Sequence, residues 1–158
     1  TLLHRSADAE GLEAICRRWR LSNHQTNRAT WLVEHQAALR EARAMPWSKL
    51  QPLLISEGIA DLLVMEEAMA LADSRPIDHV AWCRSLVTQP PETLNPPPLV
   101  TGDDLLRHGI RPGPHFRFIL QRLRDAQLDA EIQTKIESLE LADRLWKTAP
   151  WTKSSRSE

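Results

Sequence analysis

The proline-rich segment 89–98 is the feature of this sequence that most constrains its fold. These ten residues, QPPETLNPPP, hold five of the chain's eleven prolines. Proline has no backbone N–H to donate and fixes its own φ angle, so such a run is not expected to form regular helix, and it extends as a semi-rigid spacer. The sequence therefore predicts a stiff linker between one unit over 1–88 and a second over 99–147. A polar tail over 148–158 is predicted to be disordered.

Both sides of this linker are predicted to be helical. Five glycines, no tyrosine and only two phenylalanines leave little material for a sheet, whereas Leu, Ala, Arg, Glu and Gln, which favour helix, dominate the chain. Hydrophobic residues make up 42% of the sequence and charged residues 26%, as in globular proteins. We therefore predict an all-α protein of two small helical units.

Capping patterns and apolar spacing mark the expected helices. A Ser or Thr followed three residues later by Gln, Asp or Glu is typical of a helix start, because each side chain can bond the other residue's backbone N–H. The pattern occurs at Ser22, Ser48, Thr101 and Thr134, and at Ser48 it predicts only a short turn before Pro52. Helices are predicted over 7–19, 58–72 and 76–87, and after Ser22, Thr101, Pro114 and Thr134.

Cysteine usage and hydropathy favour a cytoplasmic setting. Cys16 and Cys83 lie far apart and form no Cys-x-x-Cys pair, which is expected in a reducing compartment more than in a disulfide scaffold. No apolar run approaches the roughly 18 residues that a membrane span needs, and no signal-peptide pattern opens the chain. We therefore predict a cytoplasmic protein with no membrane partner.

The net charge of -1 hides a local basic segment. Residues 103–124 carry five arginines against only Asp103 and Asp104. This segment contains the turn GIRPGP, in which Gly109 suits the left-handed end of a helix and Pro114 suits the first residue of the next one. The start of that next helix would offer unpaired N–H donors and a positive dipole end, which phosphate groups favour.

Two interpretations of this turn stay open at this point. It is either a phosphate-binding site, similar to a helix-hairpin-helix motif, or a rigid helix-to-helix connection with solvated arginines. The candidate RNA-binding residues are those at the turn and on the helices beside it: Arg107, Arg111, Gly113, His115, Arg117, Arg122, Arg124 and Lys135.

The helix after the turn has one apolar face. At about 100° per residue, Phe116, Ile119, Leu120, Leu123 and Ala126 share that face and are predicted to be core. Phe118 points away from it. This aromatic side chain could stack on a nucleotide base, and we favour packing against the helix that carries Trp146.

Further motifs connect these segments to a known family. After the basic helix come Ala126-Gln127-Leu128-Asp129-Ala130-Glu131-Ile132 and then Thr134-Lys135-Ile136-Glu137, and near the start stands Trp19-Arg20-Leu21-Ser22-Asn23. With the GIRPGP turn, these motifs resemble the C-terminal RNA-binding body and tail of bacterial class II tRNA nucleotidyltransferases, the CCA-adding enzymes and the related poly(A) polymerases. The resemblance covers about residues 10–147. The chain departs from the family at Ala130, where the family often has Gly, so we expect a longer or differently shaped turn, and at Phe118, where a polar residue is usual.

The resemblance implies an enzyme in which a catalytic head and neck precede these residues. That head would hold Mg²⁺ on two aspartates and use nucleoside triphosphates (ATP or CTP). This sequence contains neither a Gly-Gly pair nor an Asp-x-Asp pair, so it is predicted to hold no catalytic residue, metal or cofactor and to be inactive alone. Its expected partner is tRNA or other structured RNA, bound by backbone and shape. The resemblance does not distinguish a parent that adds CCA, CC, A or poly(A).

Two other functions remain as alternatives. One is a helical protein-interaction or dimerisation module, and the other is a DNA-backbone binder of helix-hairpin-helix type. The first would be favoured if several tryptophans were exposed, although we expect Trp31 and Trp82 to be core. The six tryptophans are Trp19, Trp31, Trp47, Trp82, Trp146 and Trp151.

Overall fold

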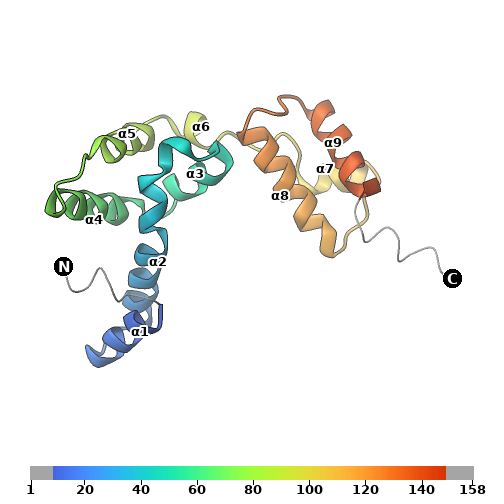
Figure 1. Ribbon diagram of the computed structural model, residues 1–158. Helices are drawn as coiled ribbons and strands as arrows, with labels where there is room; N and C mark the ends of the chain where they lie inside the picture. The colour runs from blue at the N-terminus through green and yellow to red at the C-terminus, as the bar shows by residue number, and fades with distance from the viewer. Residues whose placement is uncertain (1–8, 149–158) are drawn as a thin grey trace. The chain divides into compact units, whose positions relative to one another are not determined.

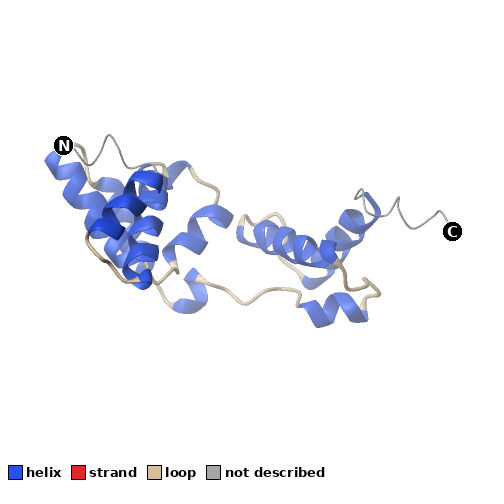
Figure 2. Cartoon of the chain, turned by 90° about the horizontal axis from the view of Figure 1, so that it is seen from below, coloured by secondary structure: helices blue, strands red, loops and turns tan. Residues whose placement is uncertain are grey.

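A computed structural model describes residues 9–148, and within them every regular element is a helix and there is no strand (Figures 1 and 2). The predicted all-α class is confirmed. The chain divides into two compact units, one formed by the residues up to Met45 with 52–90, the other by 46–51 with the residues from Pro91 onward. The predicted tail after Thr148, including Trp151, and the predicted helix start at Ala7 lie outside the described residues.

Unit 1 is a set of helices packed around α2. Within it, α2 contacts α1, α4 and α5. Helix α5 begins at Asp78, two residues later than the sequence pattern predicts. Residues 75–77 have no regular secondary structure and connect the turn after α4 to α5. The elements are α1 (Ala9–Arg18), α2 (Asn23–Arg40), the 3₁₀ turn η2 (Ala42–Ala44), the end of α3 (Trp47–Leu54), α4 (Ile59–Ala72) and α5 (Asp78–Val87).

The start of α2 is fixed by its own sequence. The Ser22 hydroxyl accepts a hydrogen bond from the Gln25 backbone N–H at 3.3 Å, and the Gln25 side chain accepts one from the Ser22 N–H at 2.9 Å. This is the predicted capping box. Further along, Trp31 stacks on His35 with ring centroids 4.5 Å apart. The Trp31 ring also lies so close to Gly58 that a Cβ there would come within 2.0 Å of it, so only glycine fits before α4.

Tryptophan burial in unit 1 differs from the prediction. Trp31 and Trp82 are half-buried and not part of the fully buried core. Each ring instead carries a guanidinium over its face, Arg28 at 5.7 Å from the Trp31 ring centroid and Arg43 at 5.4 Å from that of Trp82. These contacts let a large aromatic ring remain partly in solvent at little cost.

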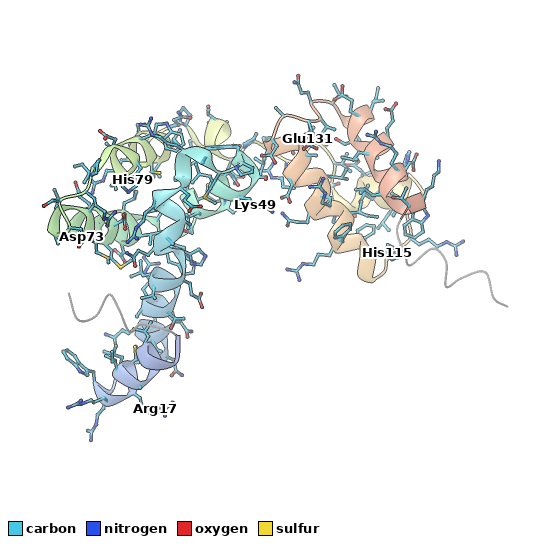
Figure 3. All side chains as sticks on the ribbon, viewed as in Figure 1. Arg17, Lys49, Asp73, His79, His115 and Glu131 are labelled. Carbon is cyan, nitrogen blue, oxygen red and sulfur yellow. The ribbon has the colours of Figure 1, made fainter. Side chains whose placement is uncertain are left out.

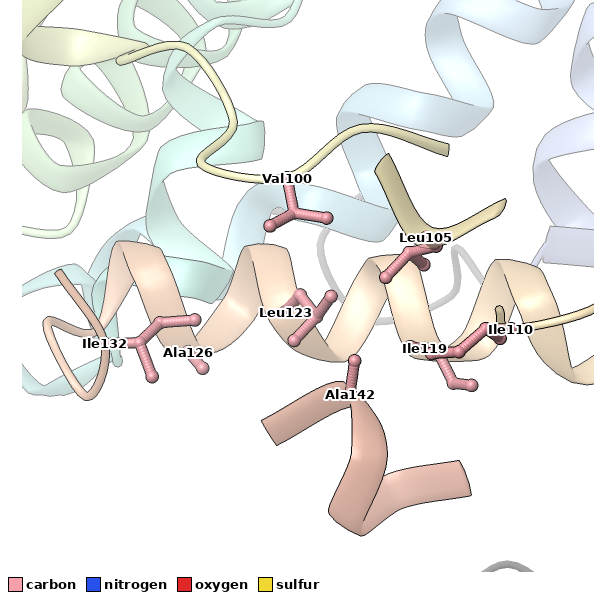
Figure 4. Close-up of a cluster of buried hydrophobic side chains, with 8 residues drawn as sticks. All are labelled: Val100, Leu105, Ile110, Ile119, Leu123, Ala126, Ile132 and Ala142. Carbon is pink, nitrogen blue, oxygen red and sulfur yellow. The ribbon is translucent and has the colours of Figure 1, made fainter. Parts of the chain in front are cut away.

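Unit 2 has an aliphatic core centred on α8, which contacts α9. The predicted apolar face of α8 is confirmed, since Ile119, Leu123 and Ala126 are buried and Phe116 and Leu120 pack at the edge. The helices are the start of α3, α6 (Pro91–Leu94), α7 (Gly102–Arg107), α8 (Pro114–Leu128) and α9 (Lys135–Thr148). The buried cluster, shown in Figure 4, consists of Val100, Leu105, Ile110, Ile119, Leu123, Ala126, Ile132 and Ala142.

The predicted capping turn at Ser48 is wrong, because α3 begins at Trp47 and continues through Pro52. The Ser48 N–H donates to the Asp129 carboxylate at 2.8 Å, so a residue distant in sequence caps this helix. A carboxylate at a helix start is favoured by the helix dipole. Gln51 does not bond Ser48 and donates to the Asn95 side chain at 2.9 Å.

The proline-rich segment is partly helical and is bonded to α8. Pro91–Leu94 forms one helical turn, which the density of prolines had argued against. Beyond it, the Gln127 amide donates to the Pro97 carbonyl at 2.8 Å and accepts from the Leu99 N–H at 3.2 Å. Prolines leave their carbonyls available as acceptors, and α8 uses them. The second half of the predicted linker is therefore held against unit 2.

The turn after α8 keeps a compact shape despite its alanine. Ala130 has φ 59°, in the left-handed region that favours glycine. The Glu131 N–H donates to the Ala126 carbonyl at 2.8 Å, and the Ala130 N–H to the Gln127 carbonyl at 3.1 Å. These two bonds form a Schellman motif. Ala130 thus adopts the left-handed conformation at the cost of backbone strain.

Candidate nucleic-acid interface

The predicted phosphate site is built on the turn between α7 and α8. Helix α7 starts with a capping box between Thr101 and Asp104 and ends at Gly109, whose φ of 96° confirms the predicted left-handed residue. The Ile110 N–H then donates to the Leu105 carbonyl at 3.0 Å, and the Ile110 side chain is buried. The turn is thus anchored at one side before α8 begins at Pro114, as predicted.

Gly113 and His115 make up the other side of the turn. The backbone of Gly113 is extended, and a Cβ there would come within 2.6 Å of the His115 ring. That ring lies edge-on to Trp146, with centroids 4.4 Å apart, and its Nε2 is 3.2 Å from the Arg111 carbonyl (His115 is labelled in Figure 3). A proton on Nε2 would let the ring donate to this carbonyl. Both residues therefore shape the turn. His115 does so by packing against Trp146 and lying close to the Arg111 carbonyl.

Two arginines beside the start of α8, and a third farther along this helix, have no ion-pair partner among the described residues. Arg111 and Arg117 are exposed and Arg122 is half-buried. Within residues 9–148, none of the three guanidiniums forms an ion pair. Arg111 and Arg117 thus place cations close to the positive end of the α8 dipole, an arrangement that attracts anions, whereas Arg122 lies beyond the first turn.

Asp104 partly neutralises the two cations on the neighbouring helices. Lys135 Nζ lies 2.6 Å from Asp104 Oδ1, and Arg107 Nη1 lies 3.7 Å from the same oxygen. The hydrogen bond from Lys135, together with those from Thr101, holds the pKa of Asp104 well below its usual range. Lys135 and Arg107 are both more than half exposed, so they can contribute to a positive surface, but less than the unpaired arginines do.

Arg124, one of the candidate RNA-binding residues, is half-buried and bonded to the proline-rich segment. Its guanidinium donates to the Pro96 carbonyl at 2.8 Å, to the Asn95 side chain at 2.7 Å and to the Gln127 side chain at 3.1 Å. Burial lowers the pKa of Arg124. These three bonds use three of the five guanidinium N–H groups, so Arg124 ties the proline-rich segment to α8 and is less available to a phosphate than Arg111 or Arg117.

Phe118 is 49% exposed on the side of α8 away from the core. The Trp146 ring of α9 lies edge-on to His115. Packing of Phe118 against the helix that carries Trp146 stays a prediction.

Sequence reasoning missed the acidic residues of α8 that organise this unit. Asp125 is buried, accepts a hydrogen bond from Gln121 at 2.8 Å and lies 3.3 Å from Lys49 Nζ (labelled in Figure 3). Asp129 caps α3. Their spacing of four residues places both carboxylates on one side of α8, which could have suggested a common partner.

Unit 1 contains a buried charge cluster around Glu66, in which two arginines share one carboxylate. Glu66 is 0% exposed and lies 2.9 Å from Arg75 Nη1, 3.2 Å from Arg40 Nε and 3.4 Å from His79 Nε2 (His79 is labelled in Figure 3). Burial pushes the pKa of Glu66 upward, but the hydrogen bonds and charges of Arg75 and Arg40 outweigh it and leave the pKa lowered. The His79 contact has ion-pair distance without hydrogen-bond geometry. The cluster contains no nucleophile. Its contacts hold α2, α4 and α5 together, which is a structural role.

Two open pockets of about 490 and 340 Å³ lie beside the first half of α2. His24, Arg28 and Glu57 line both of them. Arg28 donates to Asp61 at 2.8 Å and to the Glu57 carbonyl at 3.0 Å, so its charge is matched. An anion in these pockets would therefore meet no unpaired arginine among the described lining residues, in contrast to the turn before α8.

The described residues show neither a metal-ligand cluster nor a membrane-spanning helix. Residues 9–148 contain no group of three His, Cys, Asp or Glu side chains placed to hold a metal ion. No helix in the same range is long and apolar enough to cross a membrane. Cys16 and Cys83 are buried free thiols, and burial raises the pKa of Cys83.

Comparison of the chain with models of known protein families, with curated proteins and with solved structures found no match.

Proposed function

We propose that this chain binds tRNA or another structured RNA by its backbone and shape, as the RNA-holding part of a cytoplasmic RNA nucleotidyltransferase. One observation carries the proposal. Arg111 and Arg117 flank the start of α8 with exposed guanidiniums that pair with no carboxylate in the described chain, on a turn that Gly109 and Gly113 hold in a fixed shape. Fixed cations at a helix start suit phosphate groups and carry no base-reading geometry.

The proposal of a nucleotidyltransferase parent rests on the sequence motifs alone. The likeness of GIRPGP, the Ala126-Gln127 run and the Ser22 boundary to the nucleotidyltransferase body and tail supports a parent enzyme whose chemistry takes place in another domain. In that arrangement these residues hold the RNA, while Mg²⁺ and the nucleoside triphosphate belong to the catalytic head.

The salt dependence of tRNA binding tests the proposal. If Arg111, Arg117 and Arg122 each reach a phosphate, the logarithm of the affinity should fall against the logarithm of salt concentration with a slope of about −2 to −3. The double variant Arg111→Glu/Arg117→Glu should reduce the affinity at least tenfold and flatten that slope. A matched control is Arg43→Glu/Arg84→Glu, which changes the net charge equally at arginines already engaged by Trp82 and Glu67.

Three outcomes would contradict the proposal or move it to another ligand. Equal loss in both double variants would reduce the site to general charge attraction. Stronger binding of duplex DNA than of tRNA in direct competition would favour the helix-hairpin-helix alternative. No binding of tRNA even at low salt, with a dimer found by light scattering, would favour the protein-interaction module.

A further inference from the structure

The end of α1 presents a tryptophan to solvent between arginines. Trp19 is 74% exposed, more than any other large hydrophobic side chain of the described residues. Arg17, Arg18 and Arg20 surround it in sequence, and all three are exposed (Arg17 is labelled in Figure 3). We name these four residues the Arg-Trp corner.

The backbone of this corner is fixed on both sides. The Leu21 N–H donates to the Cys16 carbonyl at 3.0 Å and the Arg20 N–H to the Arg17 carbonyl at 3.1 Å, which closes α1. Arg20 has φ 55°, a left-handed conformation that costs a residue with a Cβ free energy. The capping box at Ser22 starts α2 immediately afterward. Trp19 is therefore held at a rigid corner, and presenting it loses little chain entropy on binding.

The charge around the corner is of one sign. Residues 14–33 contain four arginines and no acidic residue. Of these arginines only Arg28 is paired, and no carboxylate whose side chain the structure describes pairs with Arg17, Arg18 or Arg20. Basic residues at a helix end also favour the helix dipole, which accounts for one or two of them. It does not account for an indole left in solvent among three unpaired cations.

We propose that the Arg-Trp corner binds an unpaired nucleotide of RNA, whose base stacks on Trp19 while its phosphates contact the flanking arginines. This inference rests on the proposed RNA-binding function and assigns a single-stranded part of the ligand to unit 1. An indole offers a face to any exposed base, whereas bases in a duplex are covered by their neighbours. A neutral protein surface would have to desolvate three arginines without compensation, which disfavours it as the occupant.

The test compares two RNA hairpins, one blunt and one with a short single-stranded 3′ extension. Wild-type protein should bind the extended hairpin more tightly, and Trp19→Ala should reduce its affinity for that RNA roughly tenfold while leaving the blunt hairpin unchanged. Trp19→Phe, which keeps a ring, should retain most of the affinity, and Trp19→Leu, which keeps only apolar volume, should not. Because Trp19 is exposed, circular dichroism should show all three variants folded.

The outcomes separate this inference from the proposed function. If the extension adds no affinity, or if Trp19→Leu binds the extended hairpin as well as wild type does, the stacking site is overturned. In that case, a loss of affinity for both hairpins in Arg111→Glu/Arg117→Glu still supports the site in unit 2. If the protein binds the unpaired extension as a free oligonucleotide but not the blunt hairpin, the corner is supported and the structured-RNA proposal fails. If Trp19→Ala removes binding to phosphatidylglycerol vesicles and leaves RNA binding intact, the corner is a lipid-surface contact.

Discussion

Unit 1 and unit 2 use different means to hold their helices together. In unit 1 a fully buried carboxylate, Glu66, meets Arg40 of α2 and Arg75 of the segment after α4, beside aliphatic core residues such as Leu62 and Val80. In unit 2 a cluster of aliphatic side chains surrounds α8, and charged groups such as Asp104 and Asp129 act at its edge as helix caps. The comparison teaches that the fully buried carboxylate of unit 1 joins several segments at once, whereas in unit 2 the buried Asp125 meets the exposed Lys49 and the other carboxylates cap helices.

The largest expected effect lies in the aliphatic core of unit 2. Leu105→Ala should lower the free energy of unfolding by about 3 kcal/mol, because Leu105 is 0% exposed and its removal leaves a cavity. The adjacent Leu106 is 45% exposed, so Leu106→Ala should cost less than about 1 kcal/mol. Hydrogen exchange of the α7 and α8 amides measures both. Equal effects of the two substitutions would show that the cluster is not the core of this unit.

In unit 1 the corresponding substitution is Glu66→Gln. It keeps the shape of the side chain and removes the charge that Arg40 and Arg75 share, so we expect a loss of about 2 kcal/mol in the free energy of unfolding. The two arginines remain about one-third exposed, which keeps the effect below that of a fully buried pair. Glu67→Gln, which breaks the more exposed pair with Arg84, is the control and should cost well under 1 kcal/mol. Chemical denaturation monitored by circular dichroism measures both variants, and equal losses in the two would contradict the central role of Glu66.

Acid should lower the stability of both units, because each unit contains carboxylates whose pKa is lowered in the folded chain. The pKa values of Glu66 in unit 1 and of Asp104 and Glu137 in unit 2 are lowered below the ordinary values of 4.5 for Glu and 3.8 for Asp. The unfolded chain therefore takes up protons first as pH falls, so the stability that these groups contribute is present above about pH 5 and declines below it.

Hydrogen exchange at pH 6 and at pH 4 would resolve this acid response unit by unit. Asp104→Asn should reduce the pH dependence of the α7 and α9 amides and leave that of α4 unchanged. A change in α4 of the same size would show that the two units do not respond separately.

The smallest predicted effect is a stabilisation. Ala130→Gly should raise the free energy of unfolding of unit 2 by about 0.5 to 1 kcal/mol, because glycine adopts the left-handed backbone of this turn without strain. The same substitution at Ala68, which is exposed within α4, should destabilise unit 1 by about 1 kcal/mol. Thermal unfolding followed by circular dichroism should show opposite signs, and a destabilised Ala130→Gly variant would mean that another contact of Ala130 outweighs the strain.

Much of the fold could be predicted from the sequence where the signal was local. The boxes at Ser22 and Thr101 formed as expected because each joins two residues one helical turn apart. The bond between Thr134 and Glu137 did so for the same reason. The predicted cap at Ser48 failed although its pattern was the same, because Asp129 competes for the Ser48 N–H from a distant part of the sequence.

The candidate site shows the same division between local and tertiary information. The left-handed Gly109 and the start of α8 at Pro114 were predictable from residue types alone. The sequence could not show that Arg124 would be bonded to Asn95 and Pro96 while Arg111 and Arg117 stayed unpaired. All three are arginines in one basic segment, and only the packed neighbours distinguish them.

The sequence by itself thus determined the all-helical class, most helix boundaries and the position of the basic turn, because hydrogen bonds within one helical turn and apolar periodicity depend on neighbouring residues. The tertiary structure decided which charges are matched. Glu66 binds two arginines, Asp104 attracts Lys135, and Trp19 remains exposed among unpaired cations. Those outcomes depend on segments that meet only after folding, and they determine which described cations have a carboxylate partner.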